Sequence, residues 1–347
     1  MEEEWNALYE RCLQRTSFQS FDWNYSWYEK ERENFDLFLI TYYKTNDLSA
    51  LFPFWIDKTG TLRFIADTHT DYCYFLSEIV HGSDAYVMMK HVTKKIIEEP
   101  KCKRIELKNI SQNSSLIALF STFFDNKRLL FNSNATSYIS FTPKENFFSS
   151  FSHLNAKKKQ VLKQMLKHNS IYRSKIHSYP SEYPEEKVNL LVNDMIARGE
   201  RSEEFFNQKM LSIFNDLFKK KIIVIHEVYD EENGTVAMNI AIRLDKARYM
   251  LWIDIFKDIK KINVLSNLLF LKHLYESESE PFIFDLGRGV YEYKLKNFQP
   301  DIELQYTFFY AKENFEYSKY ILKLSTKLIL KDFYKKHKKS IDRFVRR

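Results

Sequence analysis

Hydrophobic and polar residues along the 347-residue chain follow two patterns, one with the period of a β-strand and one with the period of an α-helix. In the first half we expect two short helices, the second carrying Trp23 and Trp27 and capped by Ser20 or Asp22. Pro53 lies inside a predicted strand and suggests an edge strand or a bulge. The expected strands and helices, in the order strand, strand, strand, helix, strand, helix, strand, are 35–43, 49–56, 62–66, 83–98, 104–107, 114–124 and 136–141.

A basic segment, 149–169, separates this part of the chain from a second part with the same order of elements. We expect it to form a helix that bridges the two halves, and its lysines fit one solvated face opposite a packed face. Further helices are expected at 185–198 and 203–220. The repeated order then follows at 222–229, 235–244, 248–255, 263–275, 282–286, 291–297 and 303–311, with one or two helices in the remaining residues.

This repetition predicts an α/β (α+β) protein made of two tandem domains, each a mixed, mostly antiparallel sheet flanked by helices. The expected boundaries are 1–148 for the first domain, 149–185 for the bridging helix and loop, and 186–347 for the second domain with its basic C-terminal helices. We expect the two sheets to be separate and to lie side by side.

A polar cluster follows directly on the predicted strand 282–286, around Gly287 and Gly289. Glycine allows positive φ or a close backbone approach, so this turn gathers several functional groups near one strand end. They are Asp285, Arg288, Tyr291, Tyr293 and Lys294. Strand ends are where ligands bind in open α/β sheets. An ordinary strand-to-helix turn with a solvated arginine and lysine is the alternative, and a lone pair of glycines does not exclude it.

The charged residues are numerous but nearly balanced, with 53 basic against 46 acidic side chains and a net charge of +7. General nucleic-acid binding does not follow from such a mixed surface. The three cysteines, Cys12, Cys73 and Cys102, have no metal-ligand spacing, and their odd number favours a reducing compartment. The acidic N-terminus does not resemble a signal peptide, and the apolar runs are too short to span a membrane. We therefore expect a soluble, cytoplasmic protein without a metal, of undetermined oligomeric state.

A β-meander followed by alternating helices and strands resembles the GNAT acyltransferase fold. Several stretches are similar to the CelD-like acetyltransferases associated with cellulose and other exopolysaccharide biosynthesis, which are related in architecture to Fem-type aminoacyltransferases with two GNAT-like halves. The stretches are Phe18–Trp23, Phe52–Phe54, Leu62–Phe64, Thr70–Tyr72, the basic helix after Phe151, Phe284–Gly289 and Tyr293–Lys294. The order and spacing of these loose motifs carry the resemblance, from Phe18 to about Phe309.

The resemblance implies an acyl-thioester donor, usually acetyl-CoA, and an amine or hydroxyl acceptor on a sugar or related metabolite. We expect an N-acyltransferase that moves an acyl group from an acyl-CoA to an amine of a sugar, nucleotide-sugar or polysaccharide precursor. The resemblance also implies that the second half holds the active site and that the first is a degenerate copy. GNAT proteins seat the donor pyrophosphate on a glycine-containing loop at a helix N-terminus, but Phe256–Ser266 contains no glycine. A carrier-protein thioester, another donor or an inactive site therefore stay open. The expected donor-binding residues are Trp252, Ile253, Lys257, Lys260, Lys261, Asn263 and Val264.

Acyl transfer to an amine needs a base, a donor for the oxyanion and an acid for the leaving thiolate. We place the thioester carbonyl beside Trp252–Asp254, where a splayed strand end would offer a backbone N–H. Asp254 or Glu227 is the expected base, and Tyr293, or else Tyr291, the expected acid.

The other polar side chains are expected to hold the acceptor or to brace the site. Asp285 and Arg288 either orient the acceptor or form a structural ion pair that braces the turn. Lys294 is expected to be an anchoring charge. The residues expected to help bind the acceptor are Arg288, Tyr291, Lys294, Asp71 and Tyr72. A lone histidine on a strand, such as His226, is more often structural than catalytic.

Two other functions remain open from the sequence. One is a binding or scaffold protein that has kept the fold and lost catalysis, which the missing loop glycine favours. The other is Fem-type transfer from aminoacyl-tRNA, with the basic helix Lys157–Lys167 and the basic C-terminus as an RNA surface whose binding would weaken with salt. We rank the RNA partner lower, because acidic residues offset the lysines.

Overall fold

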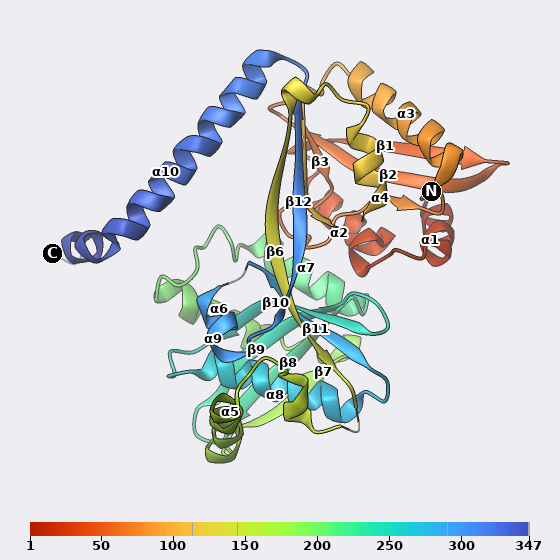
Figure 1. Cartoon of the computed structure of the whole chain (residues 1–347). Helices are drawn as coiled ribbons and strands as arrows, with labels where there is room; N and C mark the ends of the chain where they lie inside the picture. Colours follow the sequence, from red (N-terminus) through yellow and green to blue (C-terminus); the bar gives the residue numbers. More distant parts are fainter. Residues whose placement is uncertain (113, 144, 290, 346–347) are drawn as a thin grey trace.

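The computed structural model describes residues 1–345 except 113, 144 and 290, with side chains up to residue 330 (Figure 1). Val290, within the predicted polar cluster, is outside the described residues. The N-terminal half contains α1 (Glu2–Arg11), α2 (Phe21–Glu31), β1 (Phe35–Lys44), β2 (Asp47–Asp57), β3 (Thr61–Phe64), β4 (Leu76–Ser77), α3 (Gly82–Glu98), β5 (Arg104–Ser111), α4 (Ser115–Ser121) and β6 (Leu129–Phe141).

The C-terminal half begins with the basic helix and ends with a long helix. It contains α5 (Ala156–His168), β7 (Arg173–His177), α6 (Glu185–Ala197), α7 (Gln208–Lys219), β8 (Ile223–Asp230), β9 (Gly234–Arg243), β10 (Arg248–Phe256), α8 (Ile262–Ser277), β11 (Phe282–Arg288), α9 (Glu292–Asn297), β12 (Asp301–Ala311) and α10 (Asn314–Val345). The repeated order of elements predicted from the sequence is confirmed in both halves, except that the short strand β4 interrupts the first repeat and β7, before the second, was not predicted. The mixed, mostly antiparallel character of the sheet is confirmed as well.

The expectation of two separate sheets is wrong, because the strands form one continuous path. Their order is β1-β2-β3-β5-β12-β6-β11-β10-β9-β8-β7, with β4 paired to β2. The last strands of the two halves are exchanged: β12 pairs with β5 of the first half, and β6 pairs with β11 of the second. Because β6 and β12 also pair with each other along their length, they form a two-stranded ribbon that joins the halves (Figure 1).

The ribbon explains two differences from the sequence-based prediction. β6 begins at Leu129, seven residues before the predicted strand, and its first part is largely exposed, so no buried side alternates with a polar one. The basic helix α5 packs on α8 within the C-terminal half instead of bridging the halves. The two long strands make that connection, and the domain boundaries stay predictions.

Pro53 is not on an edge strand, because β2 lies between β1 and the short strands β3 and β4. β3 pairs with residues 54–56 of β2, and β4 pairs with residues 50–51. The carbonyl of Pro53 accepts from the amide of Ile65 on that side, so its nitrogen faces the gap between the two short strands. A missing N–H therefore costs no ladder hydrogen bond there.

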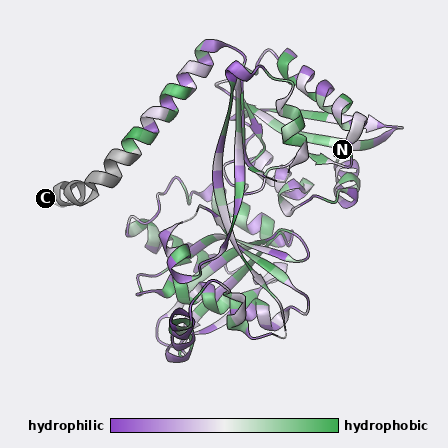
Figure 2. Ribbon diagram, in the orientation of Figure 1, coloured by the Kyte–Doolittle hydropathy of each residue, from purple (hydrophilic) through white to green (hydrophobic). Residues whose placement is uncertain are grey.

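Apolar side chains pack into clusters on both faces of the sheet, and Figure 2 shows the hydrophobic residues concentrated in the two halves. Ser20 is the cap of α2, accepting from the amide of Trp23, which settles the choice between Ser20 and Asp22. Trp23 is fully buried and packs edge-on against Trp252 of the second half, with ring centroids 5.4 Å apart. This aromatic contact places the start of the chain beside the opening described next.

Candidate active site

The strands β10 and β11 separate in the middle of the second half. Their parallel pairing covers Arg248–Met250 against Ile283–Asp285 and ends there. On the other side of β10 the register with β9 shifts between Leu251 and Ile253, so Trp252 forms a bulge. The separated strand ends form an opening at the position where the sequence placed the thioester carbonyl.

Gly287 shapes this opening by its close approach to β10. Its φ is +74°, and a Cβ atom there would lie 3.0 Å from the carbonyl oxygen of Leu251 and 3.3 Å from a carboxylate oxygen of Asp71. A side chain would therefore be strained both by the backbone conformation and by the neighbouring backbone. The glycine lets β11 turn away while staying near Leu251.

A pocket of about 450 Å³ occupies the opening, within the usual size of small-molecule sites. Both halves line it, since Thr68, His69 and Asp71 come from the first half and Asn134 from the ribbon. Eight sequence-predicted site residues meet there. They are Asp71, Trp252, Ile253, Asp254, Arg288, Tyr291, Tyr293 and Lys294.

Asp254 is the carboxylate on the bulged strand, and two amides hold it. Asn239 donates to one carboxylate oxygen at 2.7 Å, and Asn267 donates to the other at 3.2 Å. Burial raises the pKa of Asp254, while these hydrogen bonds oppose the shift. A carboxylate whose pKa is raised accepts a proton more readily, which suits a general base.

His226 stands at the far end of the same hydrogen-bond chain. Its Nδ1 lies 2.9 Å from the side-chain oxygen of Asn239, and the ring is fully buried against Phe270. Burial lowers the pKa of His226 to about 3, so the ring is neutral at pH 7. It supports the amide that holds Asp254, consistent with the structural role expected for it.

Tyr293 and Tyr291 line the pocket from the start of α9. Their rings stack with centroids 6.2 Å apart, and Tyr291 is the more exposed, at 59% against 39% for Tyr293. Burial raises the pKa of Tyr293, and the nearby charge of Asp254 raises it further. Tyr293 therefore keeps its proton at neutral pH and can donate it.

Lys294 is almost completely buried and holds the turn after β11. Its Nζ donates to the carbonyl oxygens of Gly287, Arg288 and Gly289 at 2.9, 3.1 and 3.1 Å. Burial lowers the pKa of Lys294 to about 8, although three nearby aspartates favour the charged form. These contacts anchor the turn, and the expected binding of the acceptor by Lys294 stays a prediction.

Asp71 and Arg288 form an ion pair across the two halves at the pocket wall. The Arg288 Nε lies 2.5 Å from Asp71, and its amide donates to the same carboxylate at 3.1 Å. The guanidinium also donates to the carbonyl of Thr68. Most of the charge of Arg288 is therefore satisfied within the protein.

Asp285 lies outside the pocket lining, fully buried beneath it. Thr136 and the amide of Gly287 donate to one of its oxygens at 3.0 and 2.7 Å, and Arg248 and the Tyr72 hydroxyl donate to the other. The cluster joins strands of both halves, so the geometry favours a structural role over contact with substrate for Asp285 and Tyr72. The ion pair expected between Asp285 and Arg288 is not formed, because Asp285 pairs with Arg248 and Arg288 pairs with Asp71.

Glu227 is also away from the pocket. Its carboxylate lies 2.7 Å from His177 and accepts from Lys187 and Thr235, each at 2.6 Å. Burial opposes ionisation of Glu227, but these hydrogen bonds outweigh it and hold the pKa of the carboxyl well below its usual range. Such a group is a weak base, and Asp254 is the better placed of the two candidates.

The predicted donor-binding residues after β10 lie at the N-terminus of α8, apart from this pocket. Lys257 donates to the carbonyl of Asn233 at 2.7 Å, and Val264 packs into the core. Lys260 and Lys261 line a separate cavity of about 290 Å³ between α5 and α8. Lys261 has a positive φ of 63°, in the conformation that glycine favours.

The first amides of α8 are largely engaged already. The amide of Ile262 donates to Ile259, and that of Val264 donates to the carbonyl of Lys261 and to the side chain of Asn263. Among the first three helical residues, only the amide of Asn263 has no hydrogen bond in the described part of the chain. This helix start offers fewer free donors for a pyrophosphate than an uncapped one.

Several lining residues were not among the sequence-based candidates. The ring of His69 stacks on that of Trp27 with centroids 4.1 Å apart, and burial lowers the pKa of His69 to about 4. Arg201 lies near Asp254 and Tyr293 and interacts electrostatically with both. Signals for both were present in the sequence: His69 adjoins the Thr70–Tyr72 motif, and Arg201 belongs to the polar break between α6 and α7.

Three general observations concern cofactors and surroundings. Among residues 1–330, apart from positions 113, 144 and 290, no cluster of His, Cys, Asp or Glu is arranged to hold a metal ion. The three cysteines are all buried, and burial raises their pKa. None of the helices in the described residues has the length and apolarity needed to cross a membrane.

Comparisons with known proteins find similarity in structure only. No protein-family model and no curated protein sequence matches the chain. FemX superposes with a TM-score of 0.63 at 10% identity, covering 92% of this chain and 98% of FemX. L-PGS from Bacillus licheniformis superposes with a TM-score of 0.59 at 13% identity, covering 95% of this chain and 96% of L-PGS. A conserved protein of unknown function from Bacteroides thetaiotaomicron superposes with a TM-score of 0.57 at 13% identity, covering 90% of this chain and 98% of that protein. At such identities the similarity establishes the fold, and the chain has a GNAT-like fold of two halves over nearly its full length.

Proposed function

We propose that the chain is an acyltransferase that moves an activated acyl group, from a thioester such as acyl-CoA, to an amine of a sugar, nucleotide-sugar or polysaccharide precursor. The observation that carries the proposal is the opening between β10 and β11, where Asp254 and Tyr293 line one pocket. The GNAT-like fold supports the reaction class. The CelD-like relationship and the polysaccharide precursor stay predictions.

The acyl chain of the donor would enter between the separated strands. Beyond Met250, the edge of β10 that faces β11 is no longer paired in register, so its backbone is available near the bulge at Trp252. A backbone N–H there would bind the oxygen that becomes negative in the tetrahedral intermediate. This geometry supports placing the thioester carbonyl beside Trp252–Asp254.

The proposed reaction has three balanced steps. The amine nitrogen attacks the thioester carbon while Asp254 takes one of its protons, forming the C–N bond. The tetrahedral intermediate then collapses and the C–S bond breaks. Tyr293 donates its hydroxyl proton to the leaving thiolate, and the proton on Asp254 returns to solvent or to the tyrosine.

The charges in the pocket favour an acceptor that carries an anionic group. Arg288 is largely satisfied by Asp71 and Thr68, whereas Arg201 has no ion pair among the residues that the structure describes. The nearby ring of Phe205, 5.4 Å from the Arg201 guanidinium, adds an apolar wall. A phosphate of a nucleotide-sugar beside Arg201 would form a charge-assisted hydrogen bond.

A donor screen tests this proposal. The protein would be incubated with a panel of acyl-CoAs and amino-sugar or nucleotide-amino-sugar acceptors, with release of free thiol and product mass both measured. We expect release of thiol that depends on the acceptor. If neither an acyl-CoA nor an aminoacyl-tRNA is consumed, the binding or scaffold alternative is favoured instead.

An aminoacyl-tRNA donor is a second candidate, supported by two observations. The amides at the start of α8 are largely engaged, and FemX covers nearly the whole chain. The same acceptors would therefore be assayed with aminoacyl-tRNA and, as the control, with the free amino acid. Transfer from tRNA without thiol release in the first assay would select this donor.

A further inference from the structure

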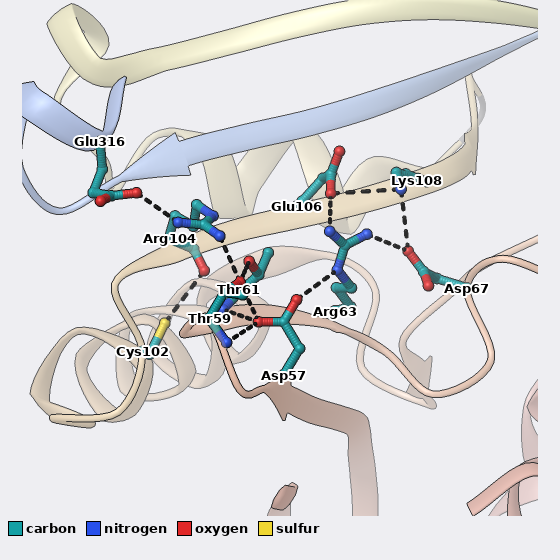
Figure 3. A network of polar contacts seen from close by, with 10 residues as sticks. All are labelled: Asp57, Thr59, Thr61, Arg63, Asp67, Cys102, Arg104, Glu106, Lys108 and Glu316. Atoms are coloured by element: carbon teal, nitrogen blue, oxygen red, sulfur yellow. Dashed lines mark hydrogen bonds and ion pairs between the residues drawn. The ribbon is translucent and has the colours of Figure 1, made fainter. Parts of the chain in front are cut away.

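α10 is fixed to the N-terminal half at its start and then leaves the body of the protein (Figure 1). Glu316 forms a 2.5 Å ion pair with Arg104, shown in Figure 3, and Tyr320 stacks on Phe309 with centroids 3.5 Å apart. The helix has 32 residues and is therefore about 48 Å long. Its first turns are held on the sheet, and its far end projects away from both halves.

The net positive charge of the chain resides in this segment. Residues 314–347 contain 11 lysines and arginines against three acidic residues, a net charge of +8. The other 313 residues contain 42 basic and 43 acidic side chains, a net charge of −1. The segment that begins with α10 therefore carries a strong positive charge, and the rest of the chain is nearly neutral.

The lysines on the described part of α10 are not neutralised by the body. Lys319, Lys323 and Lys327 repeat every four residues and line a cavity of about 360 Å³ beside the sheet. Basic residues on the sheet side of that cavity pair with acidic residues there: Arg63 with Asp57, Asp67 and Glu106, and Lys108 with Asp67 and Glu106 (Figure 3). None of the three helix lysines has an ion pair within the described residues.

Large apolar side chains are exposed on the same segment. Phe315, Leu322 and Ile329 are 72%, 69% and 68% exposed and recur every seven residues, so they lie on one side of the helix. Leu328 and Leu330 are also exposed, at 58% and 61%. Figure 2 shows hydrophobic and hydrophilic residues alternating along the coloured first part of α10. The segment thus carries both exposed apolar side chains and lysines, the two kinds of side chain with which helices bind membrane surfaces.

We propose that α10 docks the protein on an anionic lipid surface. The lysines would interact with negatively charged headgroups, and the exposed apolar side chains would insert at the boundary between headgroups and acyl chains. The exposed apolar residues favour lipid over RNA, which the lysines alone would also attract. The lysines favour lipid over a second copy of the chain, because two such helices would repel each other. The proposal does not depend on the reaction at the pocket.

Vesicle sedimentation tests the proposal with the full-length protein. We expect binding to vesicles of phosphatidylcholine with phosphatidylglycerol to exceed binding to pure phosphatidylcholine at least tenfold, and to weaken as salt is raised. The double variant Lys323→Glu and Lys327→Glu should lose binding to anionic vesicles by more than about fivefold for each charge removed. Leu322→Ser with Ile329→Ser should reduce binding by a similar order at constant salt.

Leu13→Ser is the matched control, because this leucine is 99% exposed on the body and distant in sequence from α10. It should bind vesicles like the unchanged protein. All variants alter exposed positions, and their thermal unfolding should be unchanged. Equal binding to both kinds of vesicle, or retained binding in both double variants, would overturn the proposal. Binding to a single-stranded RNA but not to vesicles, or a dimer by light scattering that the leucine–isoleucine variant abolishes, would overturn it too.

Discussion

The Arg248 guanidinium donates to the Asp285 carboxylate at 2.6 Å, tying the first paired residue of β10 to the last paired residue of β11. Arg248 also lies over the ring of Tyr72 from the first half, 4.6 Å from its centroid. The pair thus fixes the point at which the sheet opens and joins that point to both halves of the protein.

Replacing Asp285 with Asn should destabilise the protein by about 3–5 kcal/mol, because it leaves the buried charge of Arg248 without its nearest partner. Urea unfolding followed by circular dichroism measures the loss. Glu303→Gln is the control, since Glu303 is a second partner of Arg248 at 3.2 Å and is less buried. The Glu303→Gln control should lose clearly less stability. Equal losses in the two variants would contradict the claim that Asp285 is the main charged partner of Arg248.

Two buried carboxylates allow stability to be separated from catalysis. Asp254→Asn should lower kcat by a factor of about 10²–10⁴, because the base is lost while the side chain keeps its shape. Glu227→Gln should leave kcat within a few-fold but destabilise the protein by about 1–3 kcal/mol, since His177, Lys187 and Thr235 lose a charged partner. Steady-state kinetics and urea unfolding on both variants check the contrast. A larger kinetic loss in the Glu227 variant would reverse the assignment.

The two stacked tyrosines give a similarly matched pair. Tyr293→Phe removes the proposed acid and should lower kcat by about 10²-fold. Tyr291→Phe removes only the hydroxyl of the more exposed ring and should change kcat by less than about threefold. With a thioester whose thiol is more acidic, the Tyr293 variant should recover much of its rate, because that leaving group needs less protonation. No recovery would argue against Tyr293 as the acid.

Lys294 should set an alkaline limit on the proposed turnover. Burial lowers the pKa of Lys294 to about 8, so above this pH the folded protein holds a neutral amine. A neutral amine has two N–H donors for the three carbonyls of the turn, and the pocket should lose its shape. Turnover is therefore expected to fall above about pH 8. The Lys294→Met variant should have a lower rate at every pH, and its pH profile should lack this alkaline fall.

The lowered pKa of Lys294 should also make the stability of the folded protein depend on pH. Lysine in the unfolded chain keeps its proton up to its ordinary pKa of 10.5, whereas the folded protein releases it near 8. Because the unfolded state binds more protons between these values, the contribution of Lys294 to stability rises with pH there. Unfolding measured from pH 7 to 10 should show this rise only when Lys294 is present.

Arg201 should determine the affinity for an anionic acceptor. Arg201→Gln removes a charge-assisted hydrogen bond and should raise KM for a phosphate-bearing acceptor by about 10- to 100-fold, with little effect on an uncharged one. Arg173→Gln, at an exposed site on β7, is the control. An equal rise for charged and uncharged acceptors would count against a phosphate beside Arg201.

Most of the order of the elements was accessible from the sequence, because long buried strands and amphipathic helices carry their own period. The short strands β4 and β7 were not predicted. The continuity of the sheet was not. The exposed start of β6 has no buried side, so only its pairing with β12 defines it as a strand. The exchange of the last strands could not be predicted either, because the hydrophobic period of a strand does not show which strand it pairs with.

The candidate site could be predicted in part for a similar reason. Asp254, Tyr293 and Lys294 adjoin strand ends or the glycine turn, and local sequence marks such places. Glu227 was equally plausible as a base, since nothing near it in sequence shows that His177 and Lys187 surround it. Arg201 comes from a loop between two helices, and only the tertiary fold brings it to the pocket.

The most direct measurement of the central claim is single-turnover transfer from an acylated donor, compared between the unchanged protein and Asp254→Asn at saturating donor and acceptor. The account predicts formation of an amide product by the unchanged protein and a rate at least about 10²-fold lower in the variant, with donor binding retained. Equal rates in the two proteins would contradict it, as would a complete lack of transfer from both thioester and aminoacyl donors.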